Sequence, residues 1–471
     1  MDIAYTTAVK NSAVPTSLLT SVRYALSKLL GTIKIEKVDL LRSELEKLEC
    51  HFTWSLESTS SKLQAVKELL ESCSQINECQ WQGQLYNFMG YILHSQGSSE
   101  EALTYLKKAE KTISDLCRPG ELGPKLLVNQ ANLAWVHYHL GELQESQAYL
   151  RKVEKITEEC SVLSKCTLHP EVNGEKGWTF VKFDLRLKRE AIKCFTEALK
   201  GDPMRREWNR GLATAMVKAY PRPQVTPAIE AQILAQVKRA RELDPDDQYL
   251  TALYLNSLSV AGQVTDETKL EGERLAKRLT KNLDGLREAL AFFRSSMSLD
   301  FAIEVAENVL ESFPSEIYVK KQLAICYKWK VFMLKESNAE DQDWIQRATA
   351  LHEEVISLRP HYLRGKLALA DIHARSGNIE RADEMYEELL YRADDLELED
   401  RQLLYSHFST HLYWIKAARS KSIDYHMKVA EIPHSSRVRK NSIRILRDII
   451  RKGMNERHGE IVDFLYGLDD I

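Results

Sequence analysis

The sequence lacks the short patterns that identify several large classes of protein. It has no GxSxG nucleophile turn, no P-loop and no HExxH zinc motif, so no enzyme class with one of these signatures is indicated. Its 8 cysteines are scattered, without a CxxC pair or a Cys/His ligand array, which favours reduced thiols and no structural zinc. No apolar run approaches the roughly 20 residues of a membrane span. We therefore expect a cytoplasmic protein that has no cofactor or metal, is not an enzyme and has no membrane partner.

A strong excess of charge of one sign is also missing. The formal net charge at pH 7 is -3 over 471 residues. Proteins that bind nucleic acid through a broad surface usually carry a basic face. Any nucleic-acid site in this chain is therefore expected to be a local basic cavity, with acidic side chains elsewhere on the surface.

What the sequence does contain is a repeat of about 34 residues, in which small side chains let two antiparallel helices pack closely. The two best copies share small and apolar residues at the same offsets, namely Gly90, Gly97, Ala102, Leu106 and Ala109 in one and Ala134, Gly141, Ser146, Leu150 and Val153 in the other. Further copies extend towards the C-terminus. This pattern predicts an all-α tetratricopeptide-repeat superhelical solenoid, whose core forms between neighbouring repeats.

Irregular repeat spacing predicts inserted helices. The interval from Ala191 to Ala302 has room for two additional units, and helices lengthened around Tyr327 to Ala348 are expected to form another insertion. A regular array forms an open groove that suits an extended peptide, whereas inserted helices can close a channel that suits a strand end or a small molecule. The insertions therefore bear on function.

We divide the chain into an N-terminal extension and three repeat subdomains. The extension covers residues 1–40, and the subdomains cover residues 41–218, 219–336 and 337–471. No acidic residue occurs from Ile3 to Ile35, which fits either a mitochondrial transit segment or a disordered leader with one amphipathic helix that ends at Gly31. We favour the leader.

Cations inside the repeats are the strongest functional candidates. A helix from Gly177 to Phe183 would place Trp178 and Lys182 four residues apart on one face, with the lysine where a repeat usually has a large apolar side chain. A lysine at such a position is expected to pair with an anion. Later helices carry further cations and polar or aromatic side chains, namely Lys218, Tyr249, Arg287, Phe292, Phe293, Arg294, Lys320, Lys321, Gln322 and Tyr327.

These candidates have two interpretations. Cations for phosphate and flat rings for stacking are what the end of a single-stranded nucleic acid requires. Taken singly, each lysine also fits a side chain that covers apolar surface, and each ring fits one that packs between helices. The basic segment from Arg437 to Lys452 also has two interpretations, a solvated helix face or a helix at the mouth of a channel.

Several short motifs occur in a distinctive order. The segment Leu48–Trp54 reads LECHFTW, Gly97–Leu103 reads GSSEEAL, and Asn132–Gly141 reads NLAWVHYHLG. His169–Glu171 with Glu175–Trp178 follows, and then Ile325–Lys328. In this order the motifs resemble those of the interferon-induced proteins with tetratricopeptide repeats, from about Leu41 to the C-terminus.

The resemblance implies that the chain binds the 5' end of single-stranded RNA, triphosphorylated or capped without 2'-O-methylation, in a basic tunnel enclosed by the superhelix. It implies that this binding blocks translation or replication of viral RNA. The site residues it implies are Trp178, Lys182, Lys218, Tyr249, Arg287, Lys321 and Gln322, to which we add Tyr327. Lys218 stands where the family has an arginine, which keeps the charge and loses the bidentate fork.

Departures from the family pattern affect what the RNA end is expected to be. Lys188 stands where a tunnel tyrosine is expected, and about Glu68 and Ser72 stand where some members have an arginine and a glutamine near the cap. We therefore expect the 5'-triphosphate to be favoured over the cap. Related family members or translation initiation factors are further partners that the resemblance leaves open.

The main alternative is a protein–protein adaptor in innate immune signalling or translation-factor binding, because adaptors are the usual role of such repeats. One subtype holds a C-terminal carboxylate with Lys, Asn, Asn, Lys and Arg at set positions of three repeats. This chain has Asn87, Tyr91, Asn132, Asn173 and Gly177 there, and only Asn132 fits. That subtype is disfavoured, while the general adaptor alternative stays open.

Overall fold

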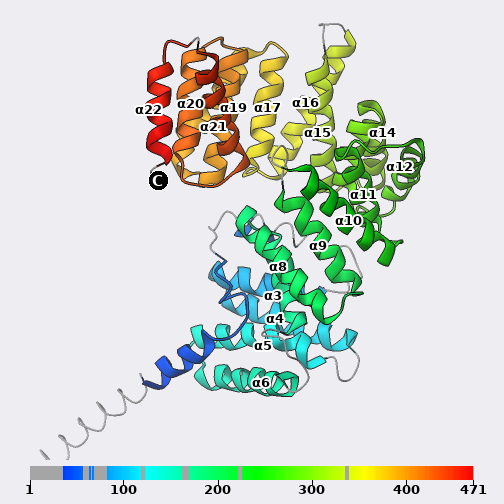
Figure 1. Cartoon of the computed structure of the whole chain (residues 1–471), viewed down its shortest axis with the longest axis vertical. Coiled ribbons are helices and arrows are strands. Elements are labelled where there is room, and N and C mark those ends of the chain that lie inside the picture. Colours follow the sequence, from blue (N-terminus) through cyan, green and yellow to red (C-terminus); the bar gives the residue numbers. More distant parts are fainter. Residues whose placement is uncertain are drawn as a thin grey trace, which may run out of the picture. The chain divides into compact units, whose positions relative to one another are not determined.

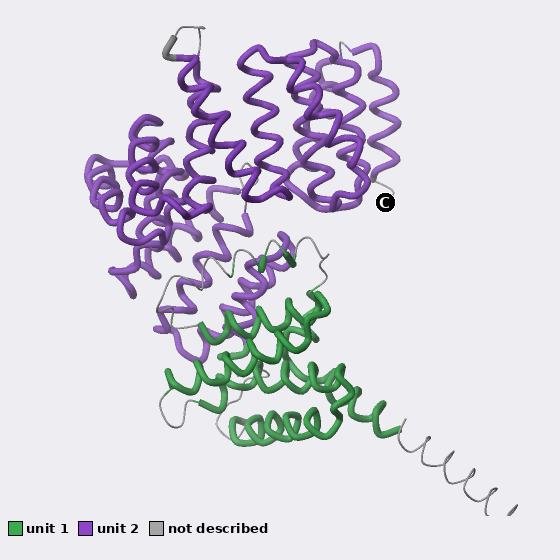
Figure 2. Tube along the Cα trace, turned by 180° about the vertical axis from the view of Figure 1, so that it is seen from behind, with its two compact units in different colours: residues 1–172 green, residues 173–471 purple. Residues whose placement is uncertain are grey.

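The computed structural model describes residues 36–56, a few positions between 63 and 70, and residues 82–117, 122–161, 169–220, 225–334, 339–453 and 455–469. Every regular element within these ranges is a helix (Figure 1), which confirms the all-α prediction. The predicted leader and its helix to Gly31 lie outside the described residues, as do Glu68 and Ser72. The chain divides into two compact units, residues 1–172 and residues 173–471 (Figure 2). The three-subdomain division and the enclosed tunnel stay predictions.

The first unit shows how small residues make a repeat. It contains the helices α3 (Gln82–Ser95), α4 (Ser99–Leu116), α5 (Leu122–His139) and α6 (Leu143–Ser161). A Cβ added at Gly90 of α3 would lie only 2.6 Å from Cγ of Leu106 of α4, so glycine is what permits this close approach. Ala102, Leu106 and Ala109 are fully buried on the facing side of α4, as the repeat pattern predicts.

The second unit continues the helix pairs. Its helices are α7 (Pro170–Phe180), α8 (Leu185–Gly201), α9 (Arg206–Ala219), α10 (Pro227–Leu243), α11 (Gln248–Val260), α12 (Asp266–Leu279), α13 (Leu286–Ser296), α14 (Leu299–Ser312), α15 (Ile317–Met333), α16 (Ala339–Leu358), α17 (Leu363–Arg375), α18 (Ile379–Tyr391), the 3-10 turn η1 (Ala393–Asp395), α19 (Leu398–Trp414), α20 (Arg419–Glu431), α21 (Arg437–Lys452) and α22 (His458–Asp469). The pairs α9/α10 and α11/α12 stand between Ala191 and Ala302, which confirms the two predicted extra units.

Several helix starts in the second unit are set by polar side chains that accept a hydrogen bond from the backbone N–H three residues later. The capping residues are Asp184, Thr226, Asp247, Thr265, Ser298, Asn378 and Ser436. Because each cap fixes where a helix begins, it also fixes which side chains of that helix face its neighbours.

The first helices of successive pairs lie next to one another. Helix α13 contacts both α11 and α15, and α17 contacts both α15 and α19. Figure 1 shows α17, α19, α20, α21 and α22 side by side at the C-terminal end of this unit. Stacked first helices build one continuous inner wall in tetratricopeptide arrays, and both sites described below are formed mainly by this wall.

The basic C-terminal helix packs as a surface helix. On α21, Leu446 is fully buried, and Ile443, Ile449 and Ile450 pack against a cluster that includes Ile461 of α22. The structure therefore supports the surface-helix interpretation of this segment. Helix α22 was not anticipated from the sequence.

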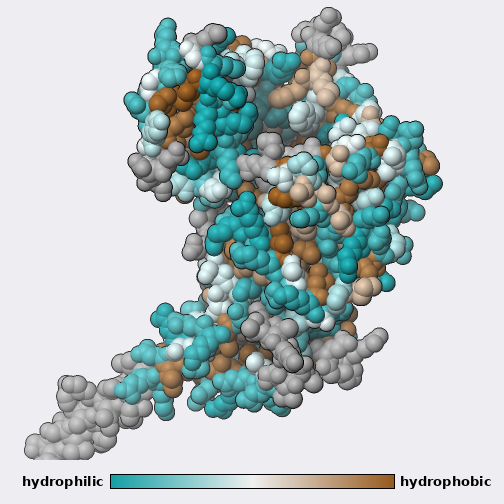
Figure 3. Space-filling view, in the orientation of Figure 1, coloured by the Kyte–Doolittle hydropathy of each residue, from teal (hydrophilic) through white to brown (hydrophobic). Residues whose placement is uncertain are grey.

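The surface of the protein is mainly hydrophilic on the face that Figure 3 shows. Figure 3 shows hydrophilic side chains over much of the face in view, with apolar patches between neighbouring helices. Among the described residues, no helix combines the length and apolar character needed to cross a membrane.

Candidate functional site

Lys218 is the centre of a cluster of positive charges in the second unit. It lies half-buried in the last turn of α9, and among the described residues its ammonium makes no hydrogen bond or ion pair. Burial and the positive charges of Lys182, Arg287 and Lys188 lower the pKa of Lys218 to about 7, opposed by the carboxylate of Glu288. A lysine in such surroundings is suited to bind an anion, because a negative ligand would offset both the repulsion between the cations and the desolvation of the Lys218 ammonium.

Glu288 was not anticipated from the sequence. It is a buried carboxylate on α13, only 7% exposed, and its Oε1 lies 2.7 Å from Nη2 and 3.1 Å from Nε of Arg287. This pairing raises the pKa of Arg287. An acid beside an arginine on a helix normally suggests a solvated face, and only the fold shows that this one points inward.

Two tyrosines lie close enough to Glu288 to feel its charge. Burial, followed by the Glu288 carboxylate, raises the pKa of Tyr249 on α11 and that of Tyr318 on α15 above the usual value. Both hydroxyls are therefore protonated at neutral pH, and each can serve as a hydrogen-bond donor. Tyr249 was predicted, whereas Tyr318 was missed.

The guanidinium of Arg210 covers one face of the Tyr249 ring. Its guanidinium lies 4.8 Å from the centroid of that ring, while its Nε is 3.2 Å from Asp247 and its Nη2 is 3.4 Å from Asp284. Since Asp247 also caps α11, the stacked arginine and the helix start are held by the same carboxylate. Tyr249 is thus a ring of fixed orientation beside the cation cluster.

The structure corrects the geometry predicted for Trp178 and Lys182. Helix α7 ends at Phe180, so a single helix face does not carry both residues. The chain turns because Asp184 must be extended to cap α8, where it accepts from the Leu187 N–H at 2.9 Å. Lys182 lies in this turn and still comes near enough to Lys218 to lower its pKa.

Trp178 itself is a packed side chain. It is 8% exposed, and its ring meets Phe195 edge-on at a centroid distance of 5.3 Å. This contact matches the packing interpretation. A role for Trp178 in RNA binding stays a prediction.

The predicted residues of α15 fall on different faces of that helix. Lys321 places its ammonium 4.4 Å from the centroid of the Tyr362 ring, and Gln322 is buried. Lys321 and Gln322 follow Tyr318 by three and four residues, so all three lie towards one side of α15.

Tyr327 is nine residues beyond Tyr318, half a turn away on the helix. Its hydroxyl donates to Glu307 at 2.6 Å and accepts from Arg347 at 2.7 Å, and Arg347 lies over its ring. The structure thus places Tyr327 in the contact of α15 with α14 and α16, apart from the Lys218 cluster. Its role in RNA binding stays a prediction.

The side chains around Lys218 suit the binding of an anion. Lys182, Lys218 and Arg287 converge, with the tyrosine hydroxyls of residues 249 and 318 nearby. No group of three or more His, Cys, Asp or Glu side chains in the described part of the chain is arranged to hold a metal ion. Cations and neutral hydroxyl donors suit phosphate oxygens.

Comparisons with known proteins agree with the repeat architecture. The family model described as tetratricopeptide repeat matches residues 83–114 and 129–160, in the α3/α4 and α5/α6 pairs. Over 324 residues the chain is 30% identical to interferon-induced protein with tetratricopeptide repeats 3 of Mus musculus, covering 66% of this chain and 75% of that protein. The chain belongs to the interferon-induced proteins with tetratricopeptide repeats.

Two solved structures of a member of this family are also similar. They are a human IFIT1 dimer with PPP-AAAA and a human IFIT1 dimer with m7Gppp-AAAA, at 27% and 25% identity. The TM-score is 0.67 for each, and each similarity covers 91% of this chain and 96% of the other. The similarity to these structures covers residues of both units.

Proposed function

We propose that this protein binds the 5' end of single-stranded RNA, with the triphosphate favoured over a cap that lacks 2'-O-methylation, and that it acts in this way as an antiviral effector. The observation that carries the proposal is Lys218. It is a half-buried cation without an anionic partner among the described residues, and it is surrounded by further cations. A 5'-triphosphate brings three or four negative charges to one place, and it would therefore neutralise this cluster more fully than a single acidic side chain.

The roles of the residues follow from their positions. Lys182, Lys218 and Arg287 neutralise the terminal phosphates, and the Tyr249 and Tyr318 hydroxyls donate to phosphate or sugar oxygens. Lys321 and Gln322 contact the following nucleotides. Human IFIT1, solved with PPP-AAAA and with m7Gppp-AAAA, supports the ligand class, and the departures at Lys188 and near Glu68 support the triphosphate.

Blocked translation or replication of viral RNA is the proposed consequence of this binding. A protein that covers the 5' end withholds it from the factors that must engage that end first. Related family members and translation initiation factors are proposed as protein partners on the resemblance alone, and the cytoplasm is the proposed location.

The test is a fluorescence anisotropy titration with one oligoadenylate RNA that carries a 5'-triphosphate, an unmethylated cap or a 5'-hydroxyl. We expect the triphosphate RNA to bind at least about ten-fold more tightly than the hydroxyl RNA, with an affinity that falls steeply as salt increases. Lys218→Met should remove most of the difference. Lys193→Met is the matched control, because Lys193 is 72% exposed on α8 and pairs with Glu190. Equal binding of triphosphate and hydroxyl RNA would refute an end-reading site.

The adaptor alternative has separate structural support, which lies in a groove on the later first helices of the second unit.

A further inference from the structure

The inner wall formed by α15, α17 and α19 contains a groove that shares only Lys321 with the proposed RNA site. It has a volume of about 740 Å³ and is lined along one face of each of these helices, with His352 and Val355 of α16 at one side. Its floor is made of small or apolar side chains, among them Ala324, Gly365 and Ala368. A concave apolar site of this size is typical of sites that bury a ligand or a few side chains of a partner.

Two exposed indoles border this groove. Trp329 of α15 is 49% exposed and Trp414 at the end of α19 is 75% exposed, and both belong to the groove lining. Tryptophan left in water is uncommon on a surface without a partner and is enriched in the residues that dominate protein–protein binding. The turn after Trp414 contains Ala417 in a left-handed conformation, at φ 51.

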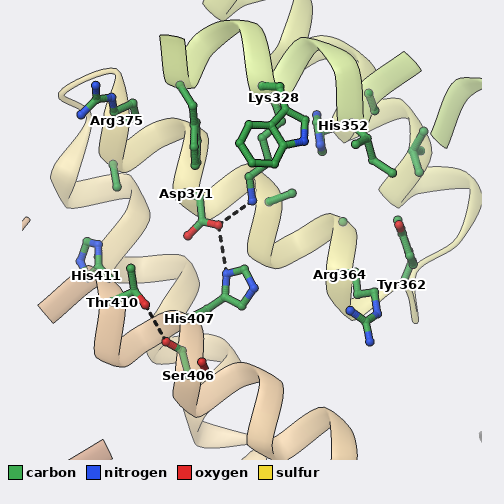
Figure 4. Close-up of a pocket in the computed structure, with 18 of the residues that line it drawn as sticks. Lys328, His352, Tyr362, Arg364, Asp371, Arg375, Ser406, His407, Thr410 and His411 are labelled. Atoms are coloured by element: carbon green, nitrogen blue, oxygen red, sulfur yellow. Dashed lines mark hydrogen bonds and ion pairs between the residues drawn. The ribbon is translucent and has the colours of Figure 1, made fainter. Parts of the chain in front are cut away.

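The centre of the groove holds an ion pair between Asp371 and Lys328. Figure 4 shows Asp371 between Lys328 and His407, and the carboxylate accepts from the Lys328 ammonium at 2.7 Å and from the Tyr386 hydroxyl at 2.6 Å. His407 lies 3.0 Å away. Hydrogen bonds and the nearby positive charges hold the pKa of Asp371 well below its usual range despite burial, so the carboxylate stays ionised and Lys328 is already neutralised.

The remaining positive charges lie at the two ends of the groove floor. Arg364 and Arg375 are eleven residues apart at opposite ends of α17 (Figure 4), a separation of roughly 16 Å from the helical rise. Arg375 is exposed and makes no ion pair with a described residue, and Arg364 approaches Glu399 only at 4.0 Å. Lys321 also lines the groove and lies over the Tyr362 ring.

This charge pattern fits a peptide better than a nucleic acid. A single strand presents a phosphate at every nucleotide, so its central phosphates would face Asp371 and find Lys328 already paired. A peptide can place apolar side chains over the centre and acidic side chains only at the ends. Since an extended chain advances about 3.3 Å per residue, roughly five residues span the two arginines.

We propose that the α15/α17/α19 groove is a docking site for an extended protein segment with a core of about five residues, rich in large apolar side chains and bounded by acidic residues. The apolar side chains lie on the small-residue floor between Trp329 and Trp414, and the acidic residues pair with Arg375 at one end and with Arg364 at the other. The proposal does not depend on RNA binding, and it gives the adaptor alternative a specific surface.

The test uses the full chain and three fluorescein-labelled 12-residue peptides. The first has a five-residue Leu- and Phe-rich centre flanked by glutamates, the second has lysines in place of the glutamates, and the third has serines in place of the apolar residues. We expect anisotropy to detect binding of the first peptide only. Arg375→Glu should weaken that binding at least about ten-fold, and Trp414→Ala at least about five-fold.

Matched controls separate the groove from general surface effects. Arg392→Glu and Tyr391→Ala alter exposed residues of α18 and its C-cap outside the groove, and Tyr391 is 91% exposed. Both should leave peptide affinity unchanged. All variants are also titrated with 5'-triphosphate and 5'-hydroxyl oligoadenylate, and we expect Arg375→Glu and Trp414→Ala to retain wild-type RNA affinity.

The outcomes are distinct. If the acidic apolar peptide binds no better than the two other peptides, or if the groove variants do not weaken it, the docking site is refuted, whatever the RNA result. If Arg375→Glu and Trp414→Ala instead weaken the hydroxyl RNA, the groove serves nucleic acid and the proposal is wrong. Loss of triphosphate preference in Lys218→Met bears on the RNA site alone.

Discussion

The lowered pKa of Lys218 predicts that the proposed RNA binding depends on pH, with a definite direction. In the free protein, burial and the charges of Lys182, Arg287 and Lys188 lower this pKa to about 7. When phosphate oxygens approach, they stabilise the ammonium and raise its pKa towards the ordinary value of lysine. Binding therefore takes up a proton at neutral and higher pH, and we expect affinity to fall as the pH rises.

The size of the effect follows from the fraction of Lys218 that is charged before binding. With a pKa of about 7, roughly a quarter of the ammonium groups are charged at pH 7.5 and about 1% at pH 9. If bound phosphate keeps the group charged throughout, the association constant should fall roughly 25-fold over this interval. The window lies above the last ionisation of a terminal phosphate, so the charge of the RNA stays nearly constant.

The assay is an anisotropy titration with 5'-triphosphate oligoadenylate at pH 7.5, 8, 8.5 and 9, at constant ionic strength. Adenine does not ionise in this range, so the protein is the titrating partner. The matched variant is Lys218→Arg, which keeps a charge that cannot be shed. We expect its affinity to be nearly independent of pH over the same interval.

A flat profile in the wild type would refute the inference that Lys218 contacts phosphate. An equal slope in the wild type and in Lys218→Arg would assign the proton to another group. Only a slope that disappears in the arginine variant supports the arrangement proposed for Lys182, Lys218 and Arg287.

Three further predictions concern charge and backbone strain. Lys218→Met should raise the free energy of unfolding, measured by urea unfolding at pH 7, by on the order of 1–2 kcal/mol. Because the pKa of Lys218 is lowered in the folded state, this gain should be largest below pH 7 and should shrink towards pH 10.5. A loss of stability in the variant would contradict the inference that the buried lysine destabilises the folded protein. Glu288→Gln should bind triphosphate RNA about three- to ten-fold more tightly in the anisotropy assay, because the carboxylate paired with Arg287 competes with phosphate. The free energy of unfolding of this variant should fall by about 1–3 kcal/mol. Weaker RNA binding would show instead that the carboxylate positions Arg287. Ala417→Gly should raise the thermal midpoint by relieving up to about 1 kcal/mol of left-handed strain at φ 51, with Ala418→Gly, at φ -86, as the destabilising control.

The repeat could be predicted because its constraints are local. Gly90 and Leu106 must fit within one helix pair, and that requirement appears as small residues at fixed offsets in the sequence. The end of α7 was also signalled locally, by Asp184 and its suitability as a cap, but the periodicity of Trp178 and Lys182 suggested a continuous helix. Capping prevails because it satisfies a backbone donor that an uncapped helix start would leave exposed.

The candidate site was only partly predictable because its charges come from helices distant in sequence. Lys218 and Arg287 stand out as cations in repeat helices, so they were found. Glu288 did not stand out, since burial of its side chain depends on how α13 contacts α11 and α15. Tyr327 was chosen as a ring interleaved with the cations, and its contacts with Glu307 and Arg347 could not be read from the sequence, so its role in RNA binding stays a prediction.

A lysine at position 218 has a consequence that an arginine would not have. An arginine there would remain charged beside Lys182 and Arg287 whether or not RNA is present, and the free protein would carry the full repulsion. Lysine with a pKa of about 7 can release its proton in the free protein and regain it when phosphate arrives. The free protein thus bears a smaller electrostatic cost, and part of the binding free energy goes into taking up the proton. With RNA bound as proposed, the chain therefore loses some affinity for RNA at alkaline pH and gains stability without RNA, and the Lys218→Arg variant should show the opposite of both.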